Sequence, residues 1–265
     1  RHISNVEVRS SFEKHWDRVL SPEPGLRIPN MFAAAVDGTF RGLFVHGEDI
    51  AQSDPNTQHV QAALEAMDCV VVQDLFLNET AAYAHVFLPG TSFLEKDGTF
   101  TNAERRINRV RPVMKEKTGI SEWEIIQKLA SAMGHEMGYT SASDIMDEIA
   151  LLTPAFNGVS FKRLDSEGSL QWPVNDKFPN GAPIMHVDGF VRGKGRFMMT
   201  EYVPTAERTT RMFPLILTTG RILSQYNVGA QTRRTENSRW HAEDVLEIHP
   251  FDAEERGMAD GDYVS

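Results

Sequence analysis

The sequence has almost none of the residues that build disulfide frameworks, cysteine-bound metals or membrane spans. Its 265 residues include one cysteine, Cys69, which excludes an internal disulfide and a metal site built from cysteines. No apolar run is long enough for a transmembrane helix, and no basic start followed by an apolar stretch marks a signal peptide. We therefore expect a cytoplasmic protein without membrane insertion.

Positive charge is also in short supply. The chain has 27 Lys and Arg against 37 Asp and Glu, which gives a net charge of −10. Hydrophobic residues at 41% and charged residues at 24% are typical of folded globular proteins. The acidic balance argues against broad binding to nucleic acid, so we expect no nucleic-acid partner.

The two ends of the chain indicate a piece of a longer protein. The sequence opens at Arg1 without a methionine, and it ends at Ser265, just after a stretch that begins to look like a strand. We expect a fragment.

Three short apolar runs predict buried strands, at 42–46, 69–72 and 86–89. A helix between the first two, capped by Asp54 with Pro55 at its first position, completes a βαβ unit. Such a unit implies parallel pairing, so the fold class is α/β.

Two more helices are predicted before the chain changes character. Ser121 and Glu124 fit a capping box that opens a helix ending at Gly134, and a second helix runs through Leu152. A hairpin is suggested around 189–195, without any phosphate loop.

We place a domain boundary near residue 206, with domains at 1–205 and 206–265. The second domain offers about three strands, at 215–219, at 245–248 and from Tyr263 onward, too few to close a barrel. We expect it to be incomplete.

Polar side chains follow the first two predicted strands. Glu48 and Asp49 come after the first strand, and Gln73 and Asp74 end the second. Ligands of open α/β sheets bind at that carboxyl edge. Without a glycine-rich loop, these groups suit a ribose or a base, and Asp74 could accept both donors of a guanine edge. The alternative is that they solvate a turn or cap the next helix.

Two segments concentrate positive charge. Residues 101–120 hold six bases and two acids, and residues 205–240 hold six arginines and two acids, so each carries +4 and the rest of the chain carries −18. Arginine matches phosphate oxygens well, so the segments suit a phosphate-bearing ligand. Equally, they could face solvent or a partner subunit.

The remaining reactive side chains have ordinary interpretations. Cys69 lies in an apolar run, where a small buried thiol is normal packing. We interpret several histidines as structural, namely His46, His59, His85, His241 and His249.

An ordered series of motifs gives the chain a family resemblance. These motifs are Val45-His46-Gly47-Glu48-Asp49, Val71-Val72-Gln73-Asp74, Val86-Phe87-Leu88-Pro89, the segment Glu95 to Arg106, and Thr219-Gly220-Arg221 through Asn227. Together, over roughly residues 40–265, the chain resembles the molybdopterin oxidoreductases. It is most similar to the catalytic subunit of molybdenum- or tungsten-dependent formate dehydrogenase, especially the cytoplasmic NAD-dependent kind.

The resemblance implies a fold, a cofactor and a set of residues that bind it. It implies a parallel sheet domain followed by the start of a double-psi β-barrel that binds molybdopterin guanine dinucleotide, of which the family uses two (bis-MGD) to hold Mo or W. The residues matched to the cofactor are Gly47, Glu48, Asp49, Gln73, Asp74, Lys96, Glu122, Thr219, Gly220, Arg221, Leu223, Gln225, Tyr226 and Asn227. Lys96 and Arg221 would supply positive charge, and Gly220 would let the backbone approach closely.

The resemblance also places the chemistry elsewhere. In this family the metal-bound cysteine or selenocysteine, its neighbouring histidine and the substrate-binding arginine belong to segments that precede this chain. We therefore expect no catalytic residue and no metal ligand here, and an isolated chain that does not turn over formate. Iron–sulfur clusters, NAD and FMN would enter only in the full-length complex with its flavin and iron–sulfur electron-transfer subunits.

Two alternatives stay open. Nitrate reductase has similar cofactor-binding halves, and the large iron–sulfur subunit of NADH–quinone oxidoreductase keeps this fold as a scaffold without the metal cofactor. Polar residues at the matched positions, namely Lys96, Asn102, Thr219, Gly220 and Arg221, favour a working pocket over a scaffold.

Overall fold

The computed structural model describes residues 2–190 and 192–264. The chain divides into two compact units, one ending at Thr205 and the other beginning at Ala206. The first unit contains two small sheets and several helices, and the described residues of the second form three short helical elements and irregular chain. No helix among the described residues is both long and apolar enough to cross a bilayer.

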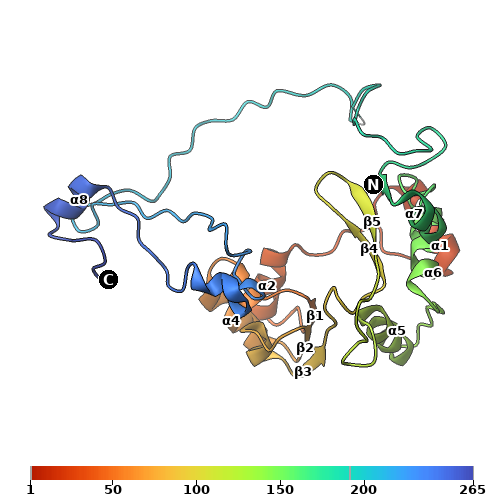
Figure 1. The fold of residues 1–265 in the computed structure, drawn as a ribbon, viewed down its shortest axis with the longest axis horizontal. Coiled ribbons are helices and arrows are strands. Elements are labelled where there is room, and N and C mark those ends of the chain that lie inside the picture. Colours follow the sequence, from red (N-terminus) through yellow and green to blue (C-terminus); the bar gives the residue numbers. More distant parts are fainter. Residues whose placement is uncertain (1, 191, 265) are drawn as a thin grey trace. The chain divides into compact units, whose positions relative to one another are not determined.

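A three-stranded parallel sheet lies in the first unit, as the apolar runs predict (Figure 1). Its strands are β1 (Gly42–His46), β2 (Cys69–Asp74) and β3 (Val86–Pro89), in the order β1-β2-β3. The register pairs His46 with Gln73 and Asp74 with Pro89. The carboxyl ends of the three strands therefore lie at one edge.

Four helical elements accompany this sheet. They are α2 (Ile28–Val36), α3 (Ile50–Ser53), α4 (Thr57–Ala66) and the 3₁₀ turn η1 (Thr80–Tyr83). The helix predicted to begin at Asp54 and Pro55 begins instead at Thr57. Asn56 adopts a left-handed conformation (φ 62°) and separates α3 from α4, so Asp54 ends the shorter helix instead of capping the longer one.

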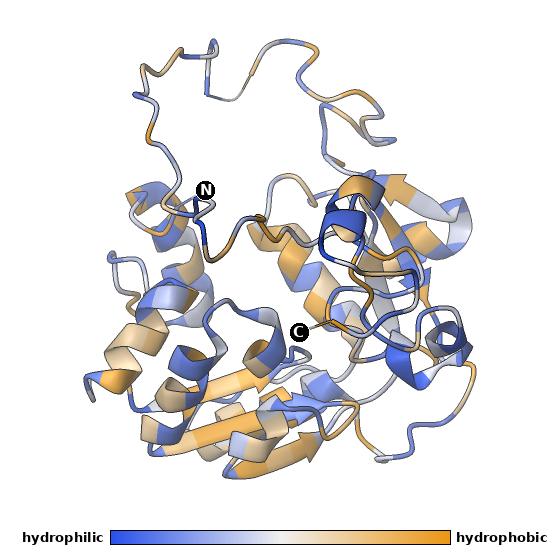
Figure 2. Cartoon of the chain, turned by 90° about the vertical axis from the view of Figure 1, so that its left-hand side faces the viewer, coloured by the Kyte–Doolittle hydropathy of each residue, from blue (hydrophilic) through white to orange (hydrophobic). Residues whose placement is uncertain are grey.

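The core around the parallel sheet is mostly aliphatic and buried. Val60, Ala63 and Leu64 of α4 are 0% exposed, as are Val70 and Val72 of β2. Figure 2 shows the parallel strands as the most hydrophobic ribbons, beside helices of mixed character. The apolar face of α4 thus covers the sheet and fixes the positions of the strand ends.

A second, antiparallel sheet was not predicted. It contains β4 (Gly98–Thr101), β5 (Arg106–Val110) and β6 (Ser169–Gln171), in that order. β6 joins from a distant part of the sequence and is only three residues long, so it carries no local signal of its own.

Three helices lie between β5 and β6 in the sequence. They are α5 (Glu122–Ala132), α6 (Ala142–Leu152) and α7 (Phe161–Glu167). The capping box predicted at Ser121 is confirmed, since Ser121 Oγ and N both contact Glu124 Oε2, at 2.6 and 2.8 Å. Ile107 of β5 and Leu164 of α7 meet in a core separate from the first.

The first helix of the chain is α1 (Val6–Trp16), which has no buried residue. Asn5 caps it by accepting a hydrogen bond from Val8 N at 3.1 Å. Trp16 Nε1 donates to Glu148 Oε1 of α6 at 2.8 Å, and Tyr139 OH donates to Oε2 of the same carboxylate at 2.6 Å. A polar contact therefore joins α1 to α6.

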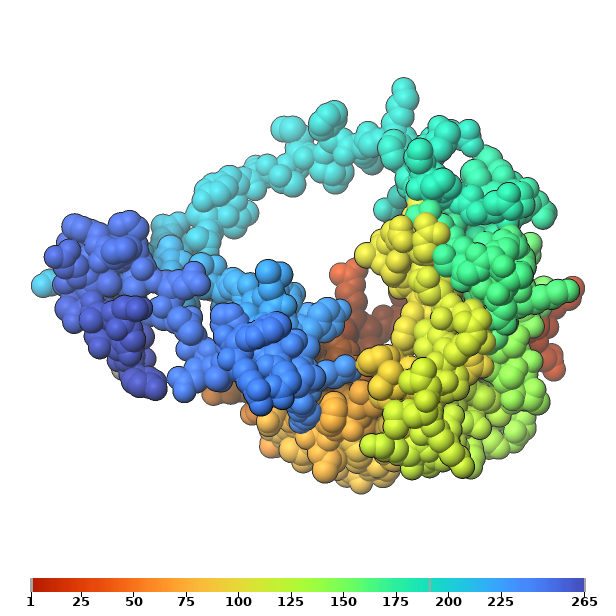
Figure 3. Space-filling view, in the orientation of Figure 1, coloured from red at the N-terminus to blue at the C-terminus, as the bar shows by residue number. Residues whose placement is uncertain are grey.

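The chain loses regular structure towards the second unit. Residues 192–204 form an extended segment without helix or strand (Figure 3). The side chains of Phe197 and Met199 in this segment are fully exposed. The hairpin suggested around 189–195 includes residue 191, which lies outside the described residues, and its other residues form no strand.

The second unit contains the 3₁₀ turns η2 (Thr232–Arg234) and η3 (Glu236–Arg239) and the helix α8 (Pro250–Glu255). The strands predicted at 215–219, at 245–248 and from Tyr263 are not formed in its described residues. An isolated strand leaves its backbone groups unpaired, and three short candidates offer too few partners for a closed sheet.

The stability of the parallel sheet and its helices should depend strongly on the packing of α4. We expect Leu64→Ala to lower the free energy of unfolding of the first unit by about 2–5 kcal/mol, because the removed side chain is fully buried. Urea unfolding followed by circular dichroism measures this. The matched control is Leu77→Ala, where the side chain is 73% exposed and a change within about 0.5 kcal/mol is expected. Equal losses in the two variants would contradict the assigned core.

Candidate functional site

The first candidate site lies at the carboxyl edge of the parallel sheet, where the backbone ties the strand ends together. Gly47 N donates to the carbonyl oxygen of Gln73, and Gly90 N donates to that of Asp74, both at 2.9 Å. A Cβ on Gly90 would lie 3.2 Å from the carbonyl carbon of Asp74 and 3.5 Å from Glu122 Oε1. Glycine at position 90 therefore lets the start of α5 approach the tip of β2.

Asp49 and Gln73 are buried here, and each has a polar atom without a partner. Asp49 is 5% exposed, and its Oδ1 accepts from Thr80 N at 3.0 Å and from Thr80 Oγ1 at 2.7 Å. Gln73 is 1% exposed, and its Oε1 lies 3.0 Å from His46 Nδ1. Asp49 Oδ2 and Gln73 Nε2 have no hydrogen-bond partner among the described residues.

Such unpaired atoms are costly, since a buried polar group without a hydrogen bond destabilises a fold by about 1–3 kcal/mol. They are therefore the atoms at this edge that would gain most from a bound polar molecule. One accepts hydrogen bonds and the other donates them.

Asp74 sits beside this pair at the end of β2. Its Oδ1 accepts from Leu75 N at 2.6 Å and its Oδ2 from Asn78 Nδ2 at 2.9 Å. Partial burial raises the pKa of Asp74, the negative charge of Asp49 adds to this rise, and His46 opposes it. The backbone N–H of Phe76 also bonds to Asp74, so three neighbouring donors already contact this carboxylate.

Lys96 and Glu122 form an ion pair at the same edge. Lys96 Nζ lies 2.7 Å from Glu122 Oε1, which also accepts from Thr91 N at 3.1 Å, and Thr91 Oγ1 donates to Oε2. Partial burial pushes the pKa of Glu122 upward, but the bonds from Lys96 and Thr91 outweigh it and the pKa is lowered. The positive charge expected from Lys96 is thus balanced by Glu122.

Together these residues form what we call the strand-tip cluster. Its members are Asp49, Gln73, Asp74, Lys96 and Glu122. Glu48 follows β1 at the same edge and is exposed, as is Gly47 (φ 65°). The seven residues predicted for the first unit therefore share one sheet edge.

The second candidate site is a pocket within the second unit, with a volume of about 540 Å³. We call it the turn pocket. It is lined by Gly220, Arg221, Ile222, Gln225, Asn227, Arg233, Ser238, His241, Ala242, Glu243 and Asp244. Four of the residues predicted for this unit line it, whereas Thr219, Leu223 and Tyr226 do not.

Hydrogen bonds shape the wall of the turn pocket. Arg221 Nη1 donates to Asn227 Oδ1 at 2.9 Å. Thr232 Oγ1 donates to Gln225 Oε1 at 2.7 Å and accepts from Tyr226 N at 3.1 Å. The predicted turn is therefore tied to η2, which carries Arg233.

Arg233 is absent from the residues matched to the cofactor, although it belongs to the positively charged segment 205–240 that suits a phosphate-bearing ligand. His241, interpreted from the sequence as a structural histidine, lies on the wall of the turn pocket. A Cβ on Gly229 (φ 75°) would lie 2.7 Å from Cγ of Arg233, so the arginine stem lies against a position that requires glycine. The structural interpretation holds for His85 and His249, whose Nδ1 atoms accept from Val70 N and Phe251 N.

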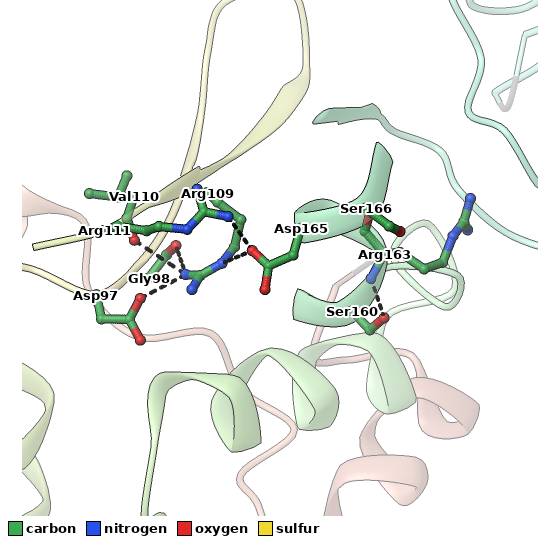
Figure 4. A network of polar contacts seen from close by, with 9 residues as sticks. All are labelled: Asp97, Gly98, Arg109, Val110, Arg111, Ser160, Arg163, Asp165 and Ser166. Atoms are coloured by element: carbon green, nitrogen blue, oxygen red, sulfur yellow. Dashed lines mark hydrogen bonds and ion pairs between the residues drawn. The ribbon is translucent and has the colours of Figure 1, made fainter. Parts of the chain in front are cut away.

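Two arginines of the other positively charged segment, 101–120, are paired with carboxylates of the first unit (Figure 4). Arg109 contacts Asp97 at 2.8 Å and Asp165 at 3.1 Å, and its guanidinium lies 3.8 Å from the centre of the Phe161 ring. Arg111 pairs with Asp165 as well, and these arginines lower the pKa of that carboxyl. Ion pairs with carboxylates thus account for these two arginines without a phosphate-bearing ligand.

The hairpin turn between β4 and β5 is likewise structural. Asn102 Oδ1 accepts from Glu104 N at 3.1 Å and from Arg106 N at 2.9 Å. Arg105 (φ 70°) donates to the carbonyl oxygens of Trp172, Ala182 and Pro183. Asn102 therefore serves the turn and gives no support to a working pocket.

Cys69 is exposed, so its interpretation as a buried core thiol is wrong. It is the first residue of β2, where Asp68 N and Cys69 N both donate to the carbonyl oxygen of Arg41. The side chain at this strand end points out of the core that encloses Val70 and Val72.

Comparison with known proteins agrees with the family resemblance. Residues 10–132 match the family described as molybdopterin oxidoreductase, and residues 215–265 match the molybdopterin dinucleotide binding domain. The second match identifies the type of domain, although its described residues form no strand.

The curated relatives are formate dehydrogenases. The F420-dependent formate dehydrogenase subunit alpha of Methanocaldococcus jannaschii is 39% identical over 96% of this chain and 38% of its own length. F420-dependent formate dehydrogenase 2 subunit alpha of Methanococcus maripaludis is 40% identical, over 97% of this chain and 39% of its own. A putative formate dehydrogenase of Staphylococcus haemolyticus is 39% identical, over 98% and 26%. The chain thus spans about two fifths or less of these relatives.

Among solved structures, acetylene hydratase from Pelobacter acetylenicus matches with a TM-score of 0.49 and 20% identity. The match covers 67% of this chain and 26% of the hydratase.

The loop that carries Lys96 should be sensitive to acid through its neighbour Glu95. Hydrogen bonds from Lys117 N and from Ser92 lower the pKa of Glu95 to about 2. Because the folded-state pKa is lowered, the carboxylate stabilises the fold fully above its unfolded pKa of about 4.3, and this contribution is lost as the pH falls towards 2. We expect Glu95→Gln to melt at a lower temperature than the parent at neutral pH, with the gap closing between about pH 4.3 and 2. A gap that stays constant through this window would contradict the assignment.

Proposed function

Because the chain belongs to the molybdopterin oxidoreductases, we propose that it forms part of a formate dehydrogenase catalytic subunit and binds a molybdopterin guanine dinucleotide. The strand-tip cluster would hold the guanosine portion. In the second unit, the turn pocket would hold the pterin or phosphate portion of a dinucleotide.

The observation that carries this proposal is the set of open hydrogen-bonding atoms at the sheet edge. Guanine presents two neighbouring donors, N1–H and the 2-amino group, and the half-buried carboxylate of Asp74 is the acceptor at this edge that would take them, in place of part of its bonding to its own loop. Asp49 Oδ2 and Gln73 Nε2 are buried without partners and suit ribose hydroxyls, which both donate and accept. The residues present therefore fit the guanosine end of the cofactor.

The turn pocket suits an anionic portion because Arg221 and Arg233 line it, and the guanidinium of Arg233 makes no hydrogen bond to any residue that the structure describes. Gly220 lies in the same wall, where the absence of a side chain allows close approach. When bound, the cofactor supplies the molybdenum or tungsten centre at which formate loses an electron pair and a proton to leave carbon dioxide. The chain's own residues bind and orient its nucleotide end.

The electron acceptor and the partners of the intact enzyme remain predictions. NAD, reached through iron–sulfur clusters and a flavin subunit, is the acceptor we expected, whereas the two archaeal relatives are named as F420-dependent. We propose that the 265 residues alone do not oxidise formate. Formate-dependent dye reduction by the purified chain would overturn this part of the proposal.

Base recognition can be tested with a nucleotide that imitates the guanosine end. GDP-mannose carries guanosine on a pyrophosphate diester, as the cofactor does. We expect Asp74→Asn to weaken its binding at least tenfold in calorimetry, because an amide offers a donor where guanine needs an acceptor. ADP-ribose should bind the parent chain more weakly than GDP-mannose.

The matched control is Asp68→Asn at the opposite end of β2, where Asp68 pairs with Arg41 on the surface. This variant should bind GDP-mannose like the parent. Equal binding by Asp74→Asn and the parent would contradict the guanine assignment, and no binding of GDP-mannose by the parent would favour the scaffold alternative.

A further inference from the structure

The charges of the arginines and carboxylates that line the turn pocket sum to zero. Arg221 and Arg233 bring positive charge, and Glu243 and Asp244 bring negative charge. The remaining ionisable side chain of the lining is His241, which makes no hydrogen bond to any residue that the structure describes. The net charge of the lining is therefore near zero with a neutral imidazole and positive with a protonated one.

We infer that His241 sets the affinity of the turn pocket for anions, so that the pocket binds phosphate-like groups more tightly when this imidazole is protonated. The inference rests on the proposed function, because it assigns a residue that controls how the same pocket receives a phosphate-bearing ligand. It adds a residue that the sequence motifs did not include.

Histidine is the side chain whose charge ordinarily changes between about pH 5 and 8, whereas arginine and the carboxylates keep theirs. The other polar groups of the lining are the two arginines, the two carboxylates and the neutral Gln225, Asn227 and Ser238. None of these is a residue type whose charge ordinarily changes over that range. A pH-dependent affinity would thus report His241.

The positions of the arginines support an anion site. Arg221 is oriented by its bond to Asn227 at 2.9 Å, and the stem of Arg233 lies against Gly229. The Arg221 guanidinium is therefore oriented before an anion binds and needs little ordering, whereas the Arg233 guanidinium has its hydrogen-bond donors open to an anion. His241 adds a charge that can be switched beside two that are fixed.

The experiment titrates the full 265-residue chain with sulfate, whose charge is constant over this pH range, at about pH 5.5 and about pH 8. Binding is followed by NMR at the backbone amides of Gly220 and Asn227. We expect the affinity of the parent to fall roughly two- to fivefold between the two conditions, the effect of one charge several ångströms away in a partly solvated pocket. His241→Gln should show no fall and should match the parent at the higher pH.

Two further variants complete the test. His241→Lys keeps a positive charge throughout, so its affinity should be independent of pH and close to that of the parent at the lower pH. His249→Asn is the matched control, because it removes an imidazole of the same unit outside the pocket while asparagine preserves the N-cap of α8. It should show the full pH dependence of the parent.

An unchanged fall in His241→Gln would overturn the inference, and so would a parent whose sulfate affinity is independent of pH or whose pocket amides do not respond to sulfate. These outcomes are separate from those of the GDP-mannose test, which reports on Asp74 in the other unit. Failure of the guanine assignment with an intact pH dependence would leave an anion pocket without the proposed nucleotide.

Discussion

Parallel pairing of β1, β2 and β3 is the constraint on which the rest of this account depends. It aligns three strand ends, so that His46 faces Gln73 and Asp74 faces Pro89. Side chains from separate stretches of sequence then share one edge, where burial and hydrogen bonding leave Asp49 Oδ2 and Gln73 Nε2 unpaired. A fold tolerates such atoms most readily where something else is to bind, and this edge is where ligands of open α/β sheets are found.

Positive charge has a different use in each of the two basic segments. Arg109 and Arg111 are paired with carboxylates and hold β5 against α7. Arg221 and Arg233 instead line a pocket, in which acidic groups oppose them. Charge counting along the sequence could not separate these cases, because the two segments have the same net charge, and the difference lies in which carboxylates the fold places beside each arginine.

Features with a local signal were predictable from the sequence, and features that depend on distant partners were not. The apolar runs of β1 to β3 and the capping box at Ser121 are local, and both are confirmed. β6 and the pairing of Lys96 with Glu122 depend on residues far along the chain. The convergence of Asp49, Gln73 and Asp74 followed from the rule for parallel sheets, whereas the place of His241 on a pocket wall required the structure.

The most direct measurement of the central claim follows the side-chain amide of Gln73 by NMR, in a chain with ¹⁵N-labelled glutamine, while GDP-mannose is added. A nucleotide seated at the strand tips should shift this resonance, because Nε2 would gain a hydrogen-bond partner. The amide of Gln127 already donates to the carbonyl oxygen of Tyr139 at 3.1 Å and should not move. A Gln73 resonance that stays fixed at saturating GDP-mannose would contradict the assignment of this edge to the cofactor.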